Sequence, residues 1–203
     1  MIAALFVEKN GIYFGLPEVD PWDITRDARL YPGPHRVVAH PPCERWGAFS
    51  TGSPMKKAYQ TGDDGGCFAS ALGSLKSFGG VLEHPANSKA WPAFGLTAPA
   101  RGGWTWDDAH GLWVGQVEQG HYGHCARKPT WLLVKGERPP ELRWGPAPQR
   151  LPEKRLKERG YKSASRCGMV AYQSKLQRQR TPEQFRDLLI YLAIETETQA
   201  LYA

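Results

Sequence analysis

Three groups of reactive side chains lie next to short apolar runs that are typical of strands. Cys43 closes the segment VVAHPPC, Glu83 closes the segment GGVLE, and histidine, cysteine and arginine side chains gather in His121–Arg127. Because open α/β sheets bind their ligands at the carboxyl ends of strands, we expect these groups to meet at one rim. A thiol, a carboxylate and a cation at one rim could perform nucleophilic addition with acid–base assistance.

Each of these residues also has a less reactive interpretation. Cys43 could pack as a small hydrophobe, although the rigid pair Pro41-Pro42 before it aims its side chain and favours the reactive interpretation. Glu83 could be a solvated or salt-bridged residue at a strand end. Arg127 could be a surface charge or a phosphate contact.

The apolar runs and the helical spacings predict a single α/β domain with a largely parallel, Rossmann-like sheet. The expected strands are Ala3–Val7, Val37–Ala39, Val81-Leu82, Trp113–Val117 and Thr130–Val134. The expected helices are one that buries Phe68, Ala71, Leu72 and Leu75, a short basic one over Leu151–Gly160, and one that opens at Pro182. The expected loops are Ser50–Gly66, which we expect to be mobile, and Ala86–Ala109.

The distribution of charge divides the chain further. Residues 135–180 hold thirteen lysines and arginines against four acidic residues, a net charge of +9, whereas the whole chain carries +6. We therefore expect a core over residues 1–134, a small basic recognition lobe over 135–180 that contacts DNA, and a C-terminal helix over 181–203 that packs back on the core. The lobe residues expected to contact nucleic acid are Arg155, Lys157 and Arg159. The alternative for this stretch is a solvated, partly disordered surface segment.

Length and composition limit the class of protein. A chain of 203 residues with 41% hydrophobic residues can form one domain with a sizeable core. No apolar run is long enough to span a bilayer, and the apolar start meets Glu8 and Lys9 too early for a signal peptide. Four cysteines without paired spacing do not form a disulfide framework, so we expect a cytoplasmic protein.

Several segments, in order, resemble motifs of the C5-cytosine DNA methyltransferases. Pro42-Cys43 matches the nucleophile motif of that family, and Glu83-His84-Pro85 stands where the family has Glu-Asn-Val. Tyr122–Arg127 resembles the Tyr-Gly and Gln-x-Arg segment that enters a strand. Arg180–Glu183 is similar to the Arg-Thr-Pro-Glu that opens the family's late helix. The resemblance covers most of the chain.

The resemblance implies chemistry at C5 and C6 of a pyrimidine, cytosine in that family, that has left the base stack. Cys43 would add to C6 as a thiolate, which needs a thiol of lowered pKa. Glu83 would hold the N3 side of the ring as an acid of raised pKa. Arg127 would clamp the ring oxygen, and Trp46 could stack on the base.

The resemblance also implies S-adenosylmethionine as the methyl donor. Glu8 would then hold the ribose, and the pair Asp23 and Ile24 would contact the adenine. The family's Phe-x-Gly-x-Gly loop, which holds the methionine part, has no counterpart ahead of Glu8, and Cys125 stands in place of the family's glutamine. In this respect the chain resembles short, phage-type variants. Methyl transfer, a cofactor-independent reaction and a partner chain that supplies the missing half all stay open.

We therefore expect a nucleic-acid-modifying enzyme that acts on a pyrimidine through Cys43, with DNA as its partner and no metal. Two other classes stay open. A degenerate methyltransferase fold could bind DNA without catalysis, which the missing loop favours. A metal-dependent enzyme could use the soft ligands at the rim, although no Cys-x-x-Cys or His-Glu-x-x-His spacing supports it. These ligands are His40, Cys43, His84, His121, His124 and Cys125.

Overall fold

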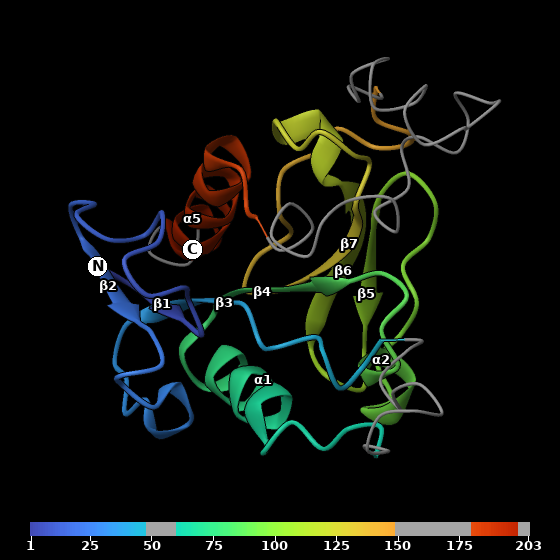
Figure 1. Cartoon of the computed structure of the whole chain (residues 1–203). Helices are drawn as coiled ribbons and strands as arrows, with labels where there is room; N and C mark the ends of the chain where they lie inside the picture. Colours follow the sequence, from blue (N-terminus) through green and yellow to red (C-terminus); the bar gives the residue numbers. More distant parts are fainter. Residues whose placement is uncertain (48–59, 149–179, 199–203) are drawn as a thin grey trace, which may run out of the picture.

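The computed structural model describes residues 1–47, 60–148 and 180–198. A seven-stranded sheet crosses the molecule, with helices on both faces (Figure 1), which confirms the α/β class. The strands are β1 (Ile2–Leu5), β2 (Val19–Trp22), β3 (Arg36–Ala39), β4 (Gly80–Pro85), β5 (Trp104–Asp107), β6 (Leu112–Glu118) and β7 (Pro129–Lys135). The helices are α1 (Cys67–Phe78), α2 (Ala90–Ala93) and α5 (Glu183–Thr198), with 3-10 turns η1 (Ala28–Leu30) and η2 (Gln119–Tyr122).

The sheet is mixed, with the strand order β2-β1-β3-β4-β7-β6-β5. The first four strands of this order are mutually parallel, which is compatible with a Rossmann-like arrangement. The last three pairings, which join β4 to β7, β7 to β6 and β6 to β5, are antiparallel. The expectation of a largely parallel sheet is therefore correct for one half of the sheet and wrong for the other.

Short connections explain two of the three antiparallel pairings, β5 with β6 and β6 with β7. Ten residues separate the end of β6 at Glu118 from the start of β7 at Pro129, and four separate β5 from β6. A parallel crossover needs a dozen or more residues and normally a helix, so chains this short return alongside the strand that they leave. Apolar runs alone do not carry this directional information.

Both edge strands lie where no strand was expected. β2 contains Pro21, and all four of its residues are half-buried, so it lacks the apolar signal of a central strand. β5 lies within the segment interpreted as a loop; its Trp104 is buried while Trp106 is exposed. Alternation over four residues at a sheet edge is a weak pattern, which explains why it was missed.

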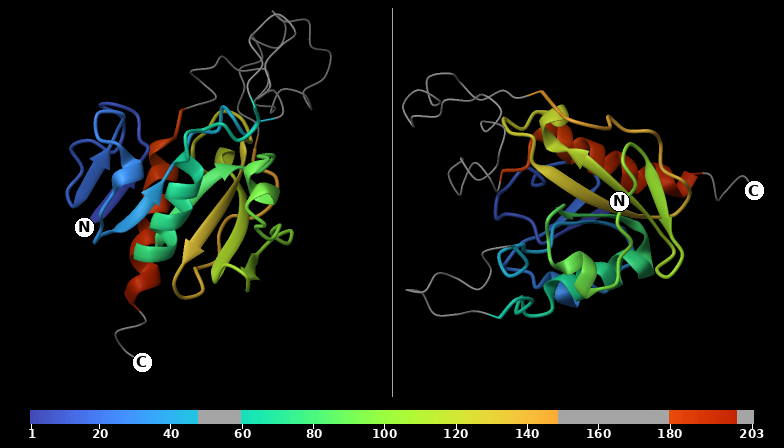
Figure 2. Two further views of the ribbon diagram at one scale, coloured as in Figure 1. Left: turned by 90° about the horizontal axis from the view of Figure 1, so that it is seen from below. Right: turned by 90° about the vertical axis from the view of Figure 1, so that its right-hand side faces the viewer.

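Two helices cover opposite faces of the sheet, as the right-hand view of Figure 2 shows. α1 buries Phe68, Leu72 and Leu75 against one face of β3, β4 and β7. α5 buries Phe185, Leu189 and other apolar residues against the opposite face. The helical spacings predicted both helices, and α5 packs on the core as expected.

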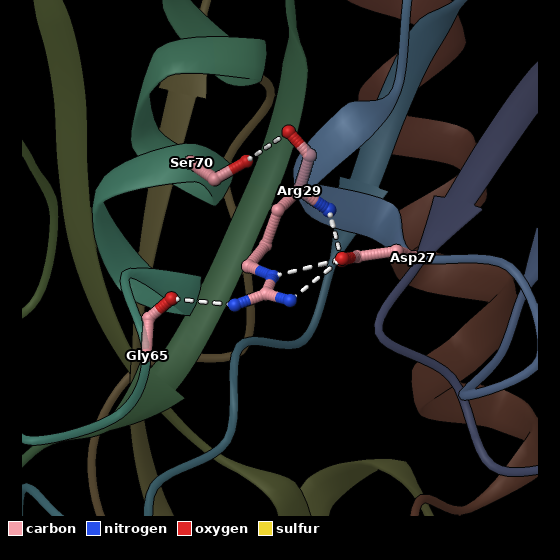
Figure 3. A network of polar contacts seen from close by, with 4 residues as sticks. All are labelled: Asp27, Arg29, Gly65 and Ser70. Carbon is pink, nitrogen blue, oxygen red and sulfur yellow. Dashed lines mark hydrogen bonds and ion pairs between the residues drawn. The ribbon is translucent and has the colours of Figure 1, made fainter.

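A polar network fixes the start of α1. Asp64 accepts hydrogen bonds from the backbone N–H groups of Gly66 and Phe68, and also from the indole N–H of Trp46 at 2.8 Å. Beside it, Arg29 donates to the carbonyl of Gly65 and pairs with Asp27 (Figure 3). These contacts join the segment after β3 and the turn η1 to the same helix end.

Gly80 allows β3 and β4 to pair closely. Its φ is +111°, and a Cβ atom there would lie 2.0 Å from the carbonyl oxygen of Val37, its partner in β3. Only glycine tolerates both the dihedral angle and the approach.

Among the described helices, none combines the length and the apolar composition that crossing a membrane would require.

Candidate active site

Cys43 lies just past the carboxyl end of β3, as the sequence predicted. Pro41 and Pro42 separate it from the strand, and its carbonyl accepts a hydrogen bond from the N–H of Trp46, which closes a turn. The side chain is exposed. An exposed thiol at the end of a central parallel strand lies where α/β sheets place their ligands.

Glu83 lies in the next strand, β4, and forms one end of a buried chain of hydrogen bonds. Its Oε1 atom lies 2.8 Å from Nδ1 of His40, and Nε2 of His40 lies 2.8 Å from the hydroxyl of Tyr13. His40 and Glu83 expose 11% and 15% of their side chains, and Tyr13 is buried. Three segments far apart in the sequence thus meet in one polar chain inside an apolar surrounding.

Tyr13 is held in this position by the C-terminal helix. Arg186 of α5 donates a hydrogen bond at 2.9 Å to the carbonyl of Ile12, the residue before Tyr13. A turn between Gly11 and Phe14 fixes the same segment from the other side. The segment between β1 and β2 is therefore clamped at the point where it delivers its hydroxyl.

Lys128 is the cation that acts on this group. It precedes β7, and its charge acts on both Glu83 and Cys43 while its Nζ donates to the carbonyl of Arg180 at 3.1 Å. Burial lowers the pKa of Lys128, and the charges of Glu83 and Cys43 work against this shift. Arg127, the residue expected to clamp the substrate, is directed to Glu118 at 3.7 Å instead.

The backbone is strained on both sides of the site. Phe6 directly follows β1 with φ at +58°, and Lys128 precedes β7 with φ at +45°. Bulky residues rarely adopt the left-handed region, because the Cβ atom crowds the carbonyl oxygen. Strain of this kind persists where the surrounding structure fixes it, and it is frequent at functional sites.

The pKa values of Cys43 and Glu83 are each shifted opposite to the direction expected. Cys43 is exposed at the surface, but the protein around its sulfur removes part of the water from it; this desolvation and the negative charge of Glu83 raise the pKa of the thiol, and Lys128 offsets this only in part. Burial alone would raise the pKa of Glu83, but the hydrogen bond and charge of His40, with the charge of Lys128, lower it below its usual value. Both shifts run opposite to those that the resemblance implies, which are a lowered pKa for the thiol and a raised pKa for the acid.

His84 does not share the site with its neighbour Glu83. Successive side chains of a strand point to opposite faces, so His84 enters the core below α1 and packs edge-on against Phe68 and Trp91. Among the described residues, neither of its ring nitrogens has a hydrogen-bond partner. Burial lowers the pKa of His84 to about 4, although the charge of Glu83 and the nearby carbonyl of Pro42 oppose the shift.

The residues expected to bind S-adenosylmethionine occupy the ends of β1 and β2. Glu8 is exposed after β1, and Ile24 is 91% exposed. Asp23 is buried and accepts hydrogen bonds from the N–H and the hydroxyl of Thr25, contacts that lower its pKa. Its carboxylate is already satisfied by its own turn.

The described residues do not form a complete site for this cofactor. β1 is hydrogen-bonded directly to β3 along its whole length, so no strand with a glycine-rich loop stands between them. The positions that remain could contact ribose and adenine only. We therefore assign no step of the chemistry to S-adenosylmethionine.

The predicted nucleic-acid contacts have mixed outcomes. Trp46 is 6% exposed and lies among Phe68 and Phe94, so stacking on a base stays a prediction that would require the indole to leave this position. Arg155, Lys157 and Arg159 lie outside the described residues, as does most of the proposed basic lobe.

The soft ligands proposed for a metal are not gathered. Within residues 1–47, 60–148 and 180–198, no three histidine, cysteine or acidic side chains are grouped closely enough to hold an ion. His121 bonds to the carbonyl of Gly145, and His84 lies on the other face of the sheet.

The sequence matches no protein-family model and no curated protein.

Three members of the site were not recognised in their roles from the sequence. The sequence suggests His40 only as a metal ligand, Tyr13 lies in a segment without a clear pattern, and Lys128 is adjacent to Arg127, the residue expected to clamp the substrate. The available signal was the position of His40 between a strand and two prolines, which points its side chain to the face opposite Ala39. The contact with Tyr13 crosses 27 residues and leaves no local signal.

Proposed function

We propose that this protein is a pyrimidine-modifying enzyme that acts on nucleic acid through Cys43. The proposal is supported by the place of the exposed Cys43 just after β3 and of Glu83 in the adjacent strand β4, with the charges of Glu83 and Lys128 both acting on the thiol. Carbon C5 of a pyrimidine becomes reactive only after a nucleophile adds to C6. A thiol next to a carboxylate and a cation offers the groups for that addition.

Each member of the group has a distinct part in this proposal. Cys43 forms a bond from Sγ to C6, and Glu83 faces the N3 side of the ring, where a proton is needed as the addition proceeds. Lys128 balances the charge of Glu83 and of the forming thiolate. We assign the stabilising cation to Lys128 rather than Arg127, because the charge of Lys128 acts on both reacting groups.

Hydrogen exchange at C5 tests the proposal without any cofactor. In the C6 adduct the electrons of the C5=C6 bond have shifted toward C4, so C5 takes up a deuteron from D2O. Loss of the original proton and release of Cys43 then return cytosine that is one mass unit heavier. Single-stranded DNA, duplex DNA and RNA that contain cytosine or uracil should be compared by mass spectrometry of the released nucleosides.

We expect exchange with the wild type and none with Cys43→Ser. Cys67→Ser is the matched control, because Cys67 is a partly exposed thiol at the start of α1. Addition of S-adenosylmethionine should not be required. Absence of exchange in all of these nucleic acids would contradict the proposal.

A non-catalytic role in binding DNA is the second candidate. The observation that favours it is the raised pKa of the Cys43 thiol, since a protonated thiol is a poor nucleophile. In that case Cys43→Ser would bind nucleic acid as well as the wild type, and neither would catalyse exchange. DNA as the partner rests on the charge of residues 135–180.

A further inference from the structure

A groove lies between α5 and the chain around η2, away from the residues that act in the proposed chemistry. It is open to solvent and has a volume of about 370 Å³, and pockets that hold small ligands begin at about 300 Å³. Two tyrosines, a leucine and three polar or charged side chains line this α5 groove: Tyr122, Arg143, Gln184, Asp187, Leu188 and Tyr191. It is therefore large enough for one planar ring and offers both apolar and polar contacts.

One face of α5 forms the first wall of the α5 groove. Gln184, Leu188 and Tyr191 are spaced by four and three residues, and Asp187 lies between them, so all four share one face of the helix. Leu188 is half-buried, whereas Tyr191 exposes 46% of its surface. An exposed aromatic ring next to a leucine is a surface on which a flat ligand can stack.

Tyr122 and Arg143 form the second wall. The Tyr122 hydroxyl accepts a hydrogen bond from the backbone N–H of Arg143 at 3.1 Å, and Nη1 of Arg143 donates to the carbonyl of His121 at 3.1 Å. The end of η2 also packs on the start of α5, since a Cβ atom on Gly123 would lie 3.5 Å from Cβ of Pro182. These contacts join the two walls and set the position of the guanidinium group.

The charged groups of the α5 groove can bind a further partner. Both contacts between Asp187 and Arg186 involve Oδ1, so Oδ2 can accept from a ligand. Arg143 bonds through Nη1, so Nε and Nη2 can donate. Guanine presents two adjacent donors, N1–H and the N2 amino group, and two adjacent acceptors, O6 and N7, whereas no other common base presents both pairs.

The α5 groove adjoins the proposed reaction site and the most basic part of the chain. Lys128, whose charge acts on Cys43, donates through Nζ to the carbonyl of Arg180, just ahead of α5. Residues 149–179 hold nine lysines and arginines against two acidic residues. They follow Ala147, whose N–H is bonded to Glu118 directly before η2, and they end at Arg180. A strand attracted by these charges is thereby brought to the groove.

We propose that the α5 groove binds one guanine base of the nucleic acid strand that presents its pyrimidine to Cys43. The inference rests on the proposed function for the nature of this strand. The guanine ring stacks on Tyr191, Asp187 accepts from the N1 and N2 donors, and Arg143 donates to O6 and N7. The groove thus selects strands in which a guanine lies near the reacting pyrimidine.

Binding of single-stranded oligonucleotides tests the preference for guanine without any catalysis. Labelled short oligothymidines that carry one central guanine, adenine or cytosine are titrated with the full chain and followed by fluorescence anisotropy. The guanine oligonucleotide should bind about tenfold more tightly than the other two, the discrimination of one bidentate contact. Equal affinities for the three would overturn the inference.

Matched variants separate recognition of the base from general attraction of charge. Asp187→Asn keeps an oxygen for Arg186 but places a donor in the groove, so the preference for guanine should fall to about twofold or less. Glu195→Gln removes the same charge from an exposed position of α5 and should keep the preference. Arg143→Gln should lose the preference, whereas Arg138→Gln, which removes an exposed arginine of the same segment, should keep it.

Tyr191 tests the stacking contact. Tyr191→Ala should weaken binding of the guanine oligonucleotide about tenfold, whereas Tyr191→Phe keeps the ring and should bind as the wild type does. A preference for guanine that persists in Asp187→Asn and Arg143→Gln, or full affinity in Tyr191→Ala, would show that the base binds elsewhere.

Two further measurements identify the ligand and separate the two proposals. Free guanosine monophosphate should bind at least about a hundredfold more weakly than the guanine oligonucleotide, because it lacks the contacts of the strand; equal affinity would overturn the strand as the occupant. Hydrogen exchange at C5 without a preference for guanine would overturn the groove alone. A preference for guanine without exchange would overturn the proposed reaction and leave the groove as a binding site for nucleic acid.

Discussion

Cys43, Glu83 and Lys128 form a small electrostatic group in which each charge changes the protonation of the others. Glu83 opposes the Cys43 thiolate and Lys128 favours it. Replacing either partner should therefore change the reactivity of the thiol in a known direction. The size of the change reports how close the three groups are in solution.

We predict that Glu83→Gln lowers the pKa of Cys43 and speeds its alkylation by iodoacetamide at pH 7.5. Lys128→Gln should raise that pKa and slow the alkylation. Each change in the alkylation rate should be about three- to tenfold, in opposite directions for the two variants. Mass spectrometry of the peptide that contains Cys43 separates it from the other thiols, and the same sign in both variants would contradict the arrangement.

His84 should make the fold sensitive to acid. Its pKa is about 4 in the folded protein and about 6.5 in an unfolded chain. The unfolded chain therefore binds more protons between these values, and stability falls as the pH drops through this window. The loss should reach about 2 kcal/mol by pH 5.

His84→Leu should remove this dependence, because it replaces an unpartnered imidazole by an apolar side chain in the same pocket. Urea unfolding of both proteins at pH 7 and pH 5 measures it. Equal losses of stability in the wild type and in His84→Leu would show that other groups determine the acid sensitivity. Glu83, whose pKa is lowered in the fold, should add a loss below pH 4.5 in both proteins.

The residue pattern predicted the position of Cys43 and Glu83 but not their protonation. Two adjacent parallel strands that are followed by polar residues bring those residues to the same edge of the sheet. The signs of the pKa shifts depend on His40 and Lys128, which act on Glu83 through tertiary contacts that span 43 residues in the case of His40. Local sequence does not contain that information.

At the scale of elements, a glycine in β4 and a glycine in α1 have opposite requirements. Gly80 has a positive φ and no room for a Cβ atom beside Val37, whereas Gly73 lies in the exposed part of α1, where an added Cβ atom would have no neighbour within 4 Å. Strain and a clash are costly, and glycine inside a helix is unfavourable for entropic reasons.

Gly80→Ala should therefore destabilise the protein by at least about 2 kcal/mol. Gly73→Ala should stabilise it by about 0.5–1 kcal/mol. Chemical unfolding at pH 7 measures both. A neutral Gly80→Ala would mean that β3 and β4 pair less closely than described.

Elements with strong periodicity were predicted correctly, and elements at the sheet edges were not. The apolar residues of α1 and α5 follow helical spacing, and the central strands are continuous apolar runs. β2 and β5 each have one neighbour in the sheet, so they bury less and carry a weaker pattern. The direction of β7 follows from the length of the connection before it rather than from its composition.

At the scale of the whole molecule, the charge of the chain is concentrated in residues 135–180. If this segment carries the affinity for nucleic acid and about five phosphates are neutralised, the slope of log K against log salt should be near −4 to −5. Reversing the charge at Arg155, Lys157 and Arg159 together should flatten the slope. Fluorescence titration of a labelled oligonucleotide at several salt concentrations measures it, and an unchanged slope would place the contact elsewhere.

The cover that α5 gives to the sheet has a consequence during synthesis. α5 packs on β1, β3, β4 and β7, so one apolar face of these strands has no partner until Glu183–Thr198 has emerged from the ribosome. Roughly a hundred residues separate β4 from this helix, a delay of about 5–20 s at ordinary rates of translation. Until then Val38, Val81 and Leu132 stay open to chaperones and to aggregation. Because Arg186 also clamps the segment that carries Tyr13, completion of the core and completion of the site occur in the same step.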